Sequence, residues 1–303
     1  MDNIEILKKY YKQVCTPLVF VGVNKLLNSK VYLYDFRDDI ELKNFKKVFQ
    51  EYMAMYVLNE DIINYYEFND VEKISEQLCE IFKENYKVLT PKRKATSSGI
   101  FGELFNDYYL KNILDNELLL TYLSKKAYAD NTEMKGIDVV CVENKEDGLE
   151  IILSEAKFVT DAISAKNELK SDISGEKNHL NQTTIDNYMY FVLNKQIGLE
   201  KARTKEVTDK ISEFNKKRIR EKKSFIEVLN ELDWSVKFVY FAIFNYKEDR
   251  NIENFKDIIE ELTDEFNNQV IKTGIKNYKI EIVLIPTFNK AIDLKNKMEE
   301  IDG

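Results

Sequence analysis

Two apolar segments separated by a short polar turn constrain the fold most strongly. Residues 136–142 read Gly-Ile-Asp-Val-Val-Cys-Val and are apolar on both faces except at Asp138, and residues 149–153 are apolar except at Glu150. Asn144, Asp147 and Gly148 lie between them and are typical of a turn. Segments rich in β-branched residues on either side of a turn predict a β-hairpin. Because such strands are buried on both faces, we expect this hairpin inside a sheet that helices cover.

The rest of the chain alternates between helical and strand patterns. Apolar residues recur at three and four spacings over residues 42–57, 71–86, 100–114 and 252–270, which predicts helices. Strands are predicted at 18–23, 31–34, 118–127, 236–244 and 278–285, and the last two flank a helix, which is typical of a βαβ crossover. Residues 161–229 are polar and predict two or three helices. The expected fold class is α/β (α+β), with a central mixed sheet flanked by helices.

A break in the pattern near residue 92 predicts two domains. Pro91 and the run Thr96-Ser97-Ser98-Gly99 interrupt the helical periodicity. We therefore expect a smaller mixed α/β domain over residues 1–92. A larger domain would span 93–303, with a helical insertion at about 161–230.

Composition excludes several classes of protein. The 303 residues carry 45 basic and 53 acidic side chains, a net charge of −8, and contain one histidine, His179, so a His-rich metal cage is excluded. The three cysteines are far apart in the sequence, which favours buried thiols in a reducing, cytoplasmic setting. The apolar runs are too short for a membrane span of about 20 residues.

Three residues of the predicted hairpin could carry chemistry. An aspartate in an apolar strand, such as Asp138, is costly to bury unless it is paired or binds a metal. Glu155 and Lys157 are two residues apart, so a strand places both on the same face. Two carboxylates beside an ammonium suit a divalent cation and a phosphate group. A structural ion pair between Glu155 and Lys157 is the alternative interpretation.

These residues resemble the PD-(D/E)xK nuclease superfamily, whose core carries an acid on a helix, an Asp on a strand and an acid-x-Lys triplet on the next strand. Glu103 would match the helix acid, Asp138 the metal-binding Asp, and Glu155-Ala156-Lys157 the triplet. The resemblance implies a restriction-endonuclease-like fold and phosphodiester hydrolysis with Mg²⁺ or Mn²⁺. Glu103, Asp138 and Glu155 would bind the metal and Lys157 would position water. Gly136-Ile137 replaces the proline that gives the motif its name.

A closer resemblance is to the HamA family of the bacterial Hachiman antiphage defence system. Residues 99–104, 135–138 and 153–158 carry this resemblance, and the whole chain has a suitable length. It implies a DNA substrate and a superfamily 2 helicase partner, HamB-like, that restrains the nuclease. Alternatives remain open: a regulatory, DNA-sensing subunit with weak catalysis, or a stand-alone restriction endonuclease.

Other features have both a functional and a structural interpretation. Residues 201–223 contain ten basic and four acidic side chains, which could follow a phosphate backbone or form a solvated helix face. His179 and Gln182 could assist the site from the helix after the triplet, but both are more often ordinary helix residues. Trp234 is most simply part of the core, although an aromatic side chain near a basic helix can stack on a base.

Overall fold

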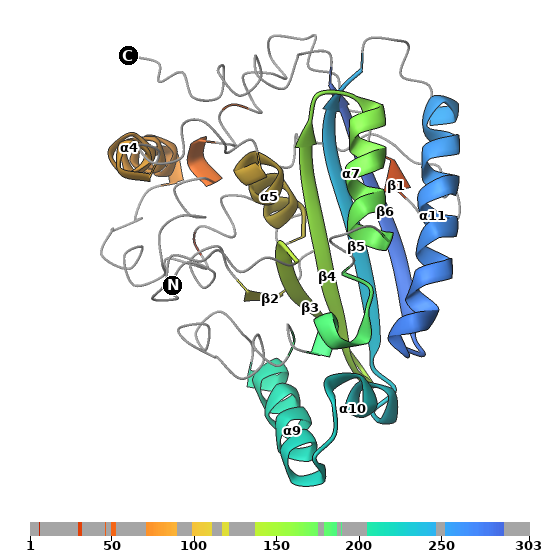
Figure 1. Ribbon diagram of the computed structural model, residues 1–303. Coiled ribbons are helices and arrows are strands. Elements are labelled where there is room, and N and C mark those ends of the chain that lie inside the picture. Colours follow the sequence, from red (N-terminus) through yellow and green to blue (C-terminus); the bar gives the residue numbers. More distant parts are fainter. Residues whose placement is uncertain are drawn as a thin grey trace.

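A computed structural model describes residues 6, 30–31, 46, 50–52, 71–89, 99–110, 117–120, 137–174, 179–186, 189, 205–246 and 252–287. Its centre is a six-stranded mixed sheet with the order β1-β6-β5-β4-β3-β2 (Figure 1). The strands are β1 (Lys30–Val31), β2 (Glu117–Leu120), β3 (Val139–Lys145), β4 (Gly148–Val159), β5 (Ser235–Asn245) and β6 (Tyr278–Thr287). The helices are α4 (Val71–Leu89), α5 (Gly99–Tyr108), α7 (Ala162–Ser174), α9 (Lys205–Glu221), α10 (Phe225–Glu231) and α11 (Lys256–Val270), with short 3-10 helices η3 (Ile252–Phe255) and η4 (Ile271–Thr273).

Strands β3 and β4 form the hairpin that the sequence predicts. They pair antiparallel from Val139 opposite Ser154 to Lys145 opposite Gly148. Strand β4 continues past the apolar segment 149–153, through the predicted acid-x-Lys triplet, to Val159, and its second edge pairs in parallel with β5. The hairpin therefore lies inside the sheet, and the expected mixed sheet flanked by helices is confirmed.

The predicted βαβ crossover is also confirmed. Strands β5 and β6 are parallel neighbours, and α11 connects them. Helix α11 buries Ile259, Leu262 and Phe266 on one side, as its apolar spacing requires. The turn after η4 ends on Gly274 with φ of 78°, a left-handed conformation that glycine adopts without steric cost.

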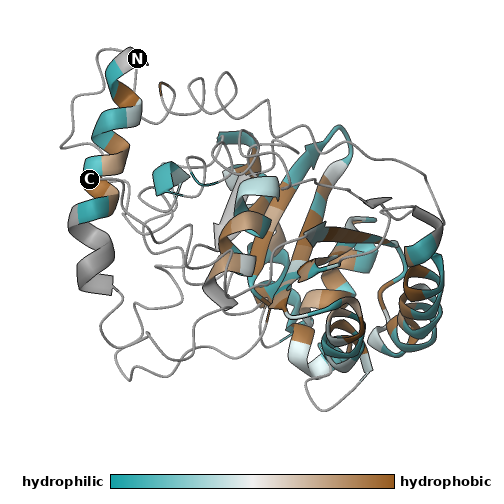
Figure 2. Cartoon of the chain, turned by 90° about the horizontal axis from the view of Figure 1, so that it is seen from above, coloured by the Kyte–Doolittle hydropathy of each residue, from teal (hydrophilic) through white to brown (hydrophobic). Residues whose placement is uncertain are grey.

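Helices cover both faces of the sheet. Helices α7 and α11 lie side by side along one face (Figure 1), where Leu169 and Phe266 join the core cluster with Leu153 of β4. On the other face, α5 contacts the alternate residues of the strands, for example Phe158 through Phe101. Figure 2 shows apolar residues concentrated on the strands and on the helix sides that face them. Successive residues of β4 thus point to two separate environments.

Trp234 belongs to the core, as its simplest interpretation predicted. Its side chain is buried and stacks on Phe214 of α9 with ring centroids 5.0 Å apart. A side chain at Gly148 would collide with the Trp234 ring, because a Cβ there would lie 2.5 Å from Cδ1. Glycine at the first position of β4 therefore makes room for the indole.

Parts of the predicted architecture lie outside the described residues. The helix expected at 71–86 is observed as α4, and the helix expected at 100–114 is observed as α5, with helical residues continuing to 110 and residues 111–114 outside the described part. The helix expected at 42–57, the strand at 18–23, most of the strands at 31–34 and 118–127, and the division near residue 92 fall largely in undescribed segments. Within the described segments, no helix is both long and apolar enough to cross a membrane.

Candidate active site

The hairpin register brings Asp138 beside Glu155. The backbone N–H of Asp138 donates to the carbonyl oxygen of Ser154 at 3.0 Å, which extends the ladder by one residue before β3 begins. The Asp138 carboxylate accepts a hydrogen bond from the backbone N–H of Ala156 at 2.8 Å. Positions 138 and 155 follow the Val139–Ser154 pair and therefore share one face of the sheet, the face that α7 covers.

Glu155 and Lys157 lie on that same face through the alternation of β4. The Lys157 Nζ atom is 3.5 Å from Glu155 Oε2, and both side chains are largely buried. The structure thus brings together three of the four residues that the sequence singled out. Their chemical roles stay predictions.

Helix α7 adds a carboxylate that the sequence analysis did not identify. Asp172 is completely buried, and its Oδ2 atom lies 2.6 Å from Lys157 Nζ. A signal was present in the sequence, because Asp172 stands beside Ile173 and three residues after Leu169, on the apolar side of the helix. An acid at such a position indicates a buried partner.

His179 also reaches the site, from the segment that follows α7. Its Nδ1 atom lies 2.9 Å from Glu155 Oε1, although the two atoms are not aligned as a hydrogen bond. Its backbone N–H donates to the carbonyl oxygen of Asp172 at 2.9 Å, which ties the segment to the end of α7. Gln182, the other polar residue considered there, is exposed.

Burial and neighbouring charges determine the protonation of these groups. Burial, reinforced by the charge of Asp138, raises the pKa of Glu155 to about 8. Burial alone would lower the pKa of Lys157, but the surrounding carboxylates outweigh it and raise that pKa, so the ammonium stays charged. Burial likewise would lower the pKa of His179, and the Glu155 carboxylate reverses this and raises it.

The cluster is suited to a divalent cation. Ligand atoms of Glu155, Asp172 and His179 all lie within 4.8 Å of one another, so these residues could hold a metal ion. With Asp138, three carboxyl groups share the one ammonium of Lys157, and the raised pKa of Glu155 reflects the cost of ionising all three without a further cation. Uncompensated negative charge is costly at a buried position, and a hard cation that prefers oxygen ligands would neutralise it.

Glu103 belongs to α5, the helix that packs on the other face of the sheet. It is partly buried on α5, which packs closely on β4: a Cβ at the adjacent Gly102 would lie 3.1 Å from the carbonyl carbon of Lys157. Ser154 also donates a hydrogen bond to Asn106 of α5 at 2.9 Å. Helix α5 therefore supports the strand that carries Glu155 and Lys157, and a metal-binding role for Glu103 stays a prediction.

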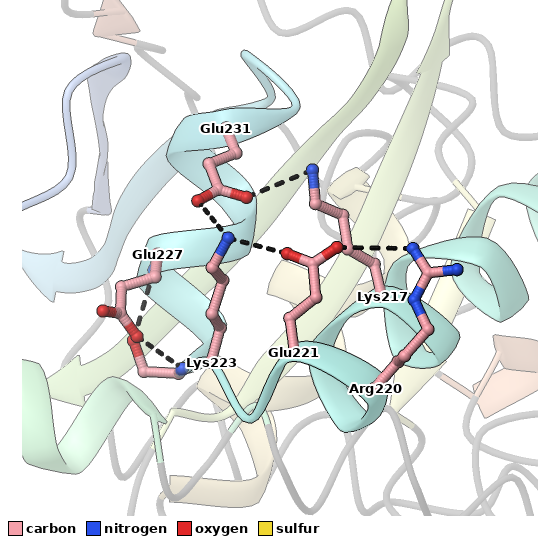
Figure 3. A network of polar contacts seen from close by, with 7 residues as sticks. Lys217, Arg220, Glu221, Lys223, Glu227 and Glu231 are labelled. Carbon is pink, nitrogen blue, oxygen red and sulfur yellow. Dashed lines mark hydrogen bonds and ion pairs between the residues drawn. The ribbon is translucent and has the colours of Figure 1, made fainter.

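Acidic residues partly neutralise the basic stretch at residues 201–223. Much of it forms α9 and the turn after it, where Lys217 and Lys223 both contact Glu231 of α10, and Lys223 also contacts Glu221 (Figure 3). Lys216 and Lys222 are exposed. Both interpretations of this stretch, phosphate contact and solvated surface, therefore stay open.

Comparison with known families gives one match of nearly full length. A family model described as HamA matches residues 9–301. No curated protein matches the chain.

Proposed function

The chain belongs to the HamA family, and on that premise we propose that it is a metal-dependent deoxyribonuclease acting in antiphage defence. The observation that carries the proposal is the cluster of buried Glu155 with the partly buried Asp138 and Lys157 on one face of the central hairpin. A PD-(D/E)xK nuclease would use this set of groups, and no cysteine or second histidine is needed.

Each group would have a distinct task. Asp138 and Glu155, with Glu103 as a further candidate, would hold Mg²⁺ or Mn²⁺. When bound, the cation would acidify water and stabilise the charge that develops on the scissile phosphate. Lys157 would orient the attacking water and support the charge that develops on the phosphate.

A purely structural ion pair explains the cluster less well. An interior pair balances its own charge, whereas here Asp138, Glu155 and Asp172 converge on the single ammonium of Lys157. A surplus of carboxylates around one ammonium, with the pKa of Glu155 raised by burial, is typical of functional sites, since it costs folding free energy.

Cleavage of supercoiled plasmid DNA tests the proposal. We expect nicking or degradation with Mg²⁺ by the wild type and a loss of at least about 100-fold in D138N and K157A, because each loses an interaction that forms in the transition state. Full activity in K157A would remove Lys157 from the mechanism, and full activity in both variants would place the chemistry elsewhere.

A helicase partner is the second part of the proposal. The net charge of −8 and the ion pairs on α9 and α10 both reduce attraction for DNA, which favours a partner that supplies the positive field. A regulatory role with weak catalysis is the competing function, and the same acidity favours it.

Reconstitution with a candidate superfamily 2 helicase partner separates the two functions. A nuclease effector should degrade DNA when the helicase and ATP are added, and D138N should abolish that degradation. A regulatory subunit should change the ATPase rate of the helicase equally in wild type and D138N, with no degradation.

A further inference from the structure

We propose that Asp172 is a positioning residue that holds the ammonium group of Lys157 at the site. The effect of Asp172 on catalysis rests on the proposed nuclease function, whereas its contact with Lys157 can be tested whether or not the chain cleaves DNA. Asp172 comes from α7, whereas Lys157 lies on β4, so the pair joins a helix to the strand of the acid-x-Lys triplet.

The geometry favours Asp172 over Glu155 as the partner of Lys157. The Lys157 Nζ atom is 2.6 Å from Asp172 Oδ2 and 3.5 Å from Glu155 Oε2. Asp172 has no exposed surface and is held by the helix among Ala165, Leu169 and Ile173. The shorter contact is therefore made to the completely buried acid of α7.

A lysine in such a site needs an anchor. Its side chain has four rotatable bonds, and its ammonium is a point charge without the fixed geometry of a guanidinium group. A cation held by Glu155 would share the charge of that carboxylate and would repel the ammonium. Asp172 would then remain as the counter-ion that keeps Lys157 aimed at the reacting phosphate.

A role for Asp172 as a metal ligand is the competing interpretation. Its carboxylate lies within 4.8 Å of ligand atoms of Glu155 and His179, so the distance alone permits it. However, Lys157 Nζ already occupies the position 2.6 Å from Oδ2, where a metal would meet a like charge. Asp172 is thus better suited to the lysine than to the metal.

Nuclear magnetic resonance of the lysine ammonium groups tests the contact without any cleavage. In protein labelled with ¹⁵N-lysine, a buried, paired ammonium exchanges slowly with water and gives its own signal. We expect one such signal that is absent in K157M, lost in D172N and retained in E155Q. The control E261Q removes an acid that pairs with Lys166 and Lys170 of the same helix, outside the site, and should retain the signal.

Metal binding and kinetics test the catalytic consequence. In D172N we expect kcat to fall about 10- to 100-fold, while KM for DNA and the dissociation constant of Mn²⁺, measured by calorimetry, change less than twofold. A weakening of Mn²⁺ binding by tenfold or more would instead make Asp172 a metal ligand and overturn the proposal. An unchanged lysine signal in D172N would overturn it as well.

A double variant covers the case in which D172N does not fold. Removing one partner of a buried pair leaves an isolated charge, whereas replacing both with apolar groups can restore stability. K157M/D172L should therefore unfold at a higher temperature than D172L alone, and additive losses would contradict the pairing. If the wild type gives the lysine signal but cleaves no DNA, the nuclease function fails while the contact stands.

Discussion

The Asp138 carboxylate accepts a hydrogen bond from the backbone N–H of Ala156 at 2.8 Å, so the acid before β3 is fixed to the middle of the Glu155–Lys157 triplet. The contact links two neighbouring strands and sets the distance between two of the proposed metal ligands. It also gives Asp138 a structural role beside the proposed catalytic one.

Two substitutions at Asp138 separate these roles. Asn keeps an oxygen that can accept from Ala156, so D138N should retain most of the stability but lose metal binding. Ala loses both, and we expect D138A to be less stable than D138N by about 1–3 kcal/mol, the cost of leaving the buried backbone N–H of Ala156 without its acceptor. Urea unfolding measures the difference, and equal stability of the two variants would deny the structural role.

Replacing His179 should weaken metal binding. Its imidazole lies 2.9 Å from Glu155 and restricts the orientation of that carboxylate. Removing a group that orients a metal ligand typically costs 10- to 100-fold in metal affinity. H179A should therefore need correspondingly more Mn²⁺ in a calorimetric titration. The exposed Gln182 provides the matched control, and Q182A should bind Mn²⁺ like the wild type.

Gly102 should be required for the position of β4. A Cβ at this residue would lie 3.1 Å from the carbonyl carbon of Lys157 and 3.3 Å from the nitrogen of Phe158, both in the backbone of the site strand. Alanine gains about 1 kcal/mol of helix propensity, which offsets part of the strain. We expect G102A to fold with modestly altered stability but to cleave DNA more slowly.

Gly148, at the start of β4, should matter for stability and not for cleavage, the reverse of what we expect for Gly102. A Cβ there would meet the Trp234 ring at 2.5 Å, at the end of β4 far from the triplet. G148A should lose about 1–3 kcal/mol through overpacking while the folded fraction cleaves normally. Slow cleavage in G148A and normal cleavage in G102A would contradict this account of the two glycines.

The ion pairs between α7 and α11 should make a small contribution that acid removes. Hydrogen bonds from Lys166 and Lys170 lower the pKa of Glu261 to about 2 from 4.5. A lowered pKa in the folded state stabilises above pH 4.5, and the contribution disappears as the pH falls toward 2. Because Glu261 is partly exposed, the difference between wild type and E261Q should stay below about 1 kcal/mol at neutral pH. Thermal unfolding across this range tests it, and a difference that grows in acid would have the wrong sign.

The elements with local patterns were predictable from the sequence. The hairpin was marked by its turn residues, and the β5-α11-β6 unit by strand patterns on either side of an amphipathic helix. The full length of β4 was not, because its last residues are stabilised by pairing with β5, about eighty residues later. The order of strands in the sheet likewise depends on contacts between distant segments.

The candidate site was predictable only where one hairpin contains it. Asp138, Glu155 and Lys157 come together through strand alternation and register, which sequence spacing encodes. Asp172 and His179 reach the same point because α7 folds back over β4, and no spacing rule gives that return. The sequence offered one indication of this contact, because Asp172 is an acid on the apolar side of α7.

Degradation of linear duplex DNA by wild type and E155Q, with the helicase partner and ATP present, tests the central claim most directly. The wild type should degrade DNA in Mg²⁺ and stop when a chelator is added. E155Q keeps the shape of the side chain but cannot ionise to bind a cation, so it should be inactive under both conditions. Equal degradation by the two proteins would contradict a metal-dependent nuclease site at the end of β4.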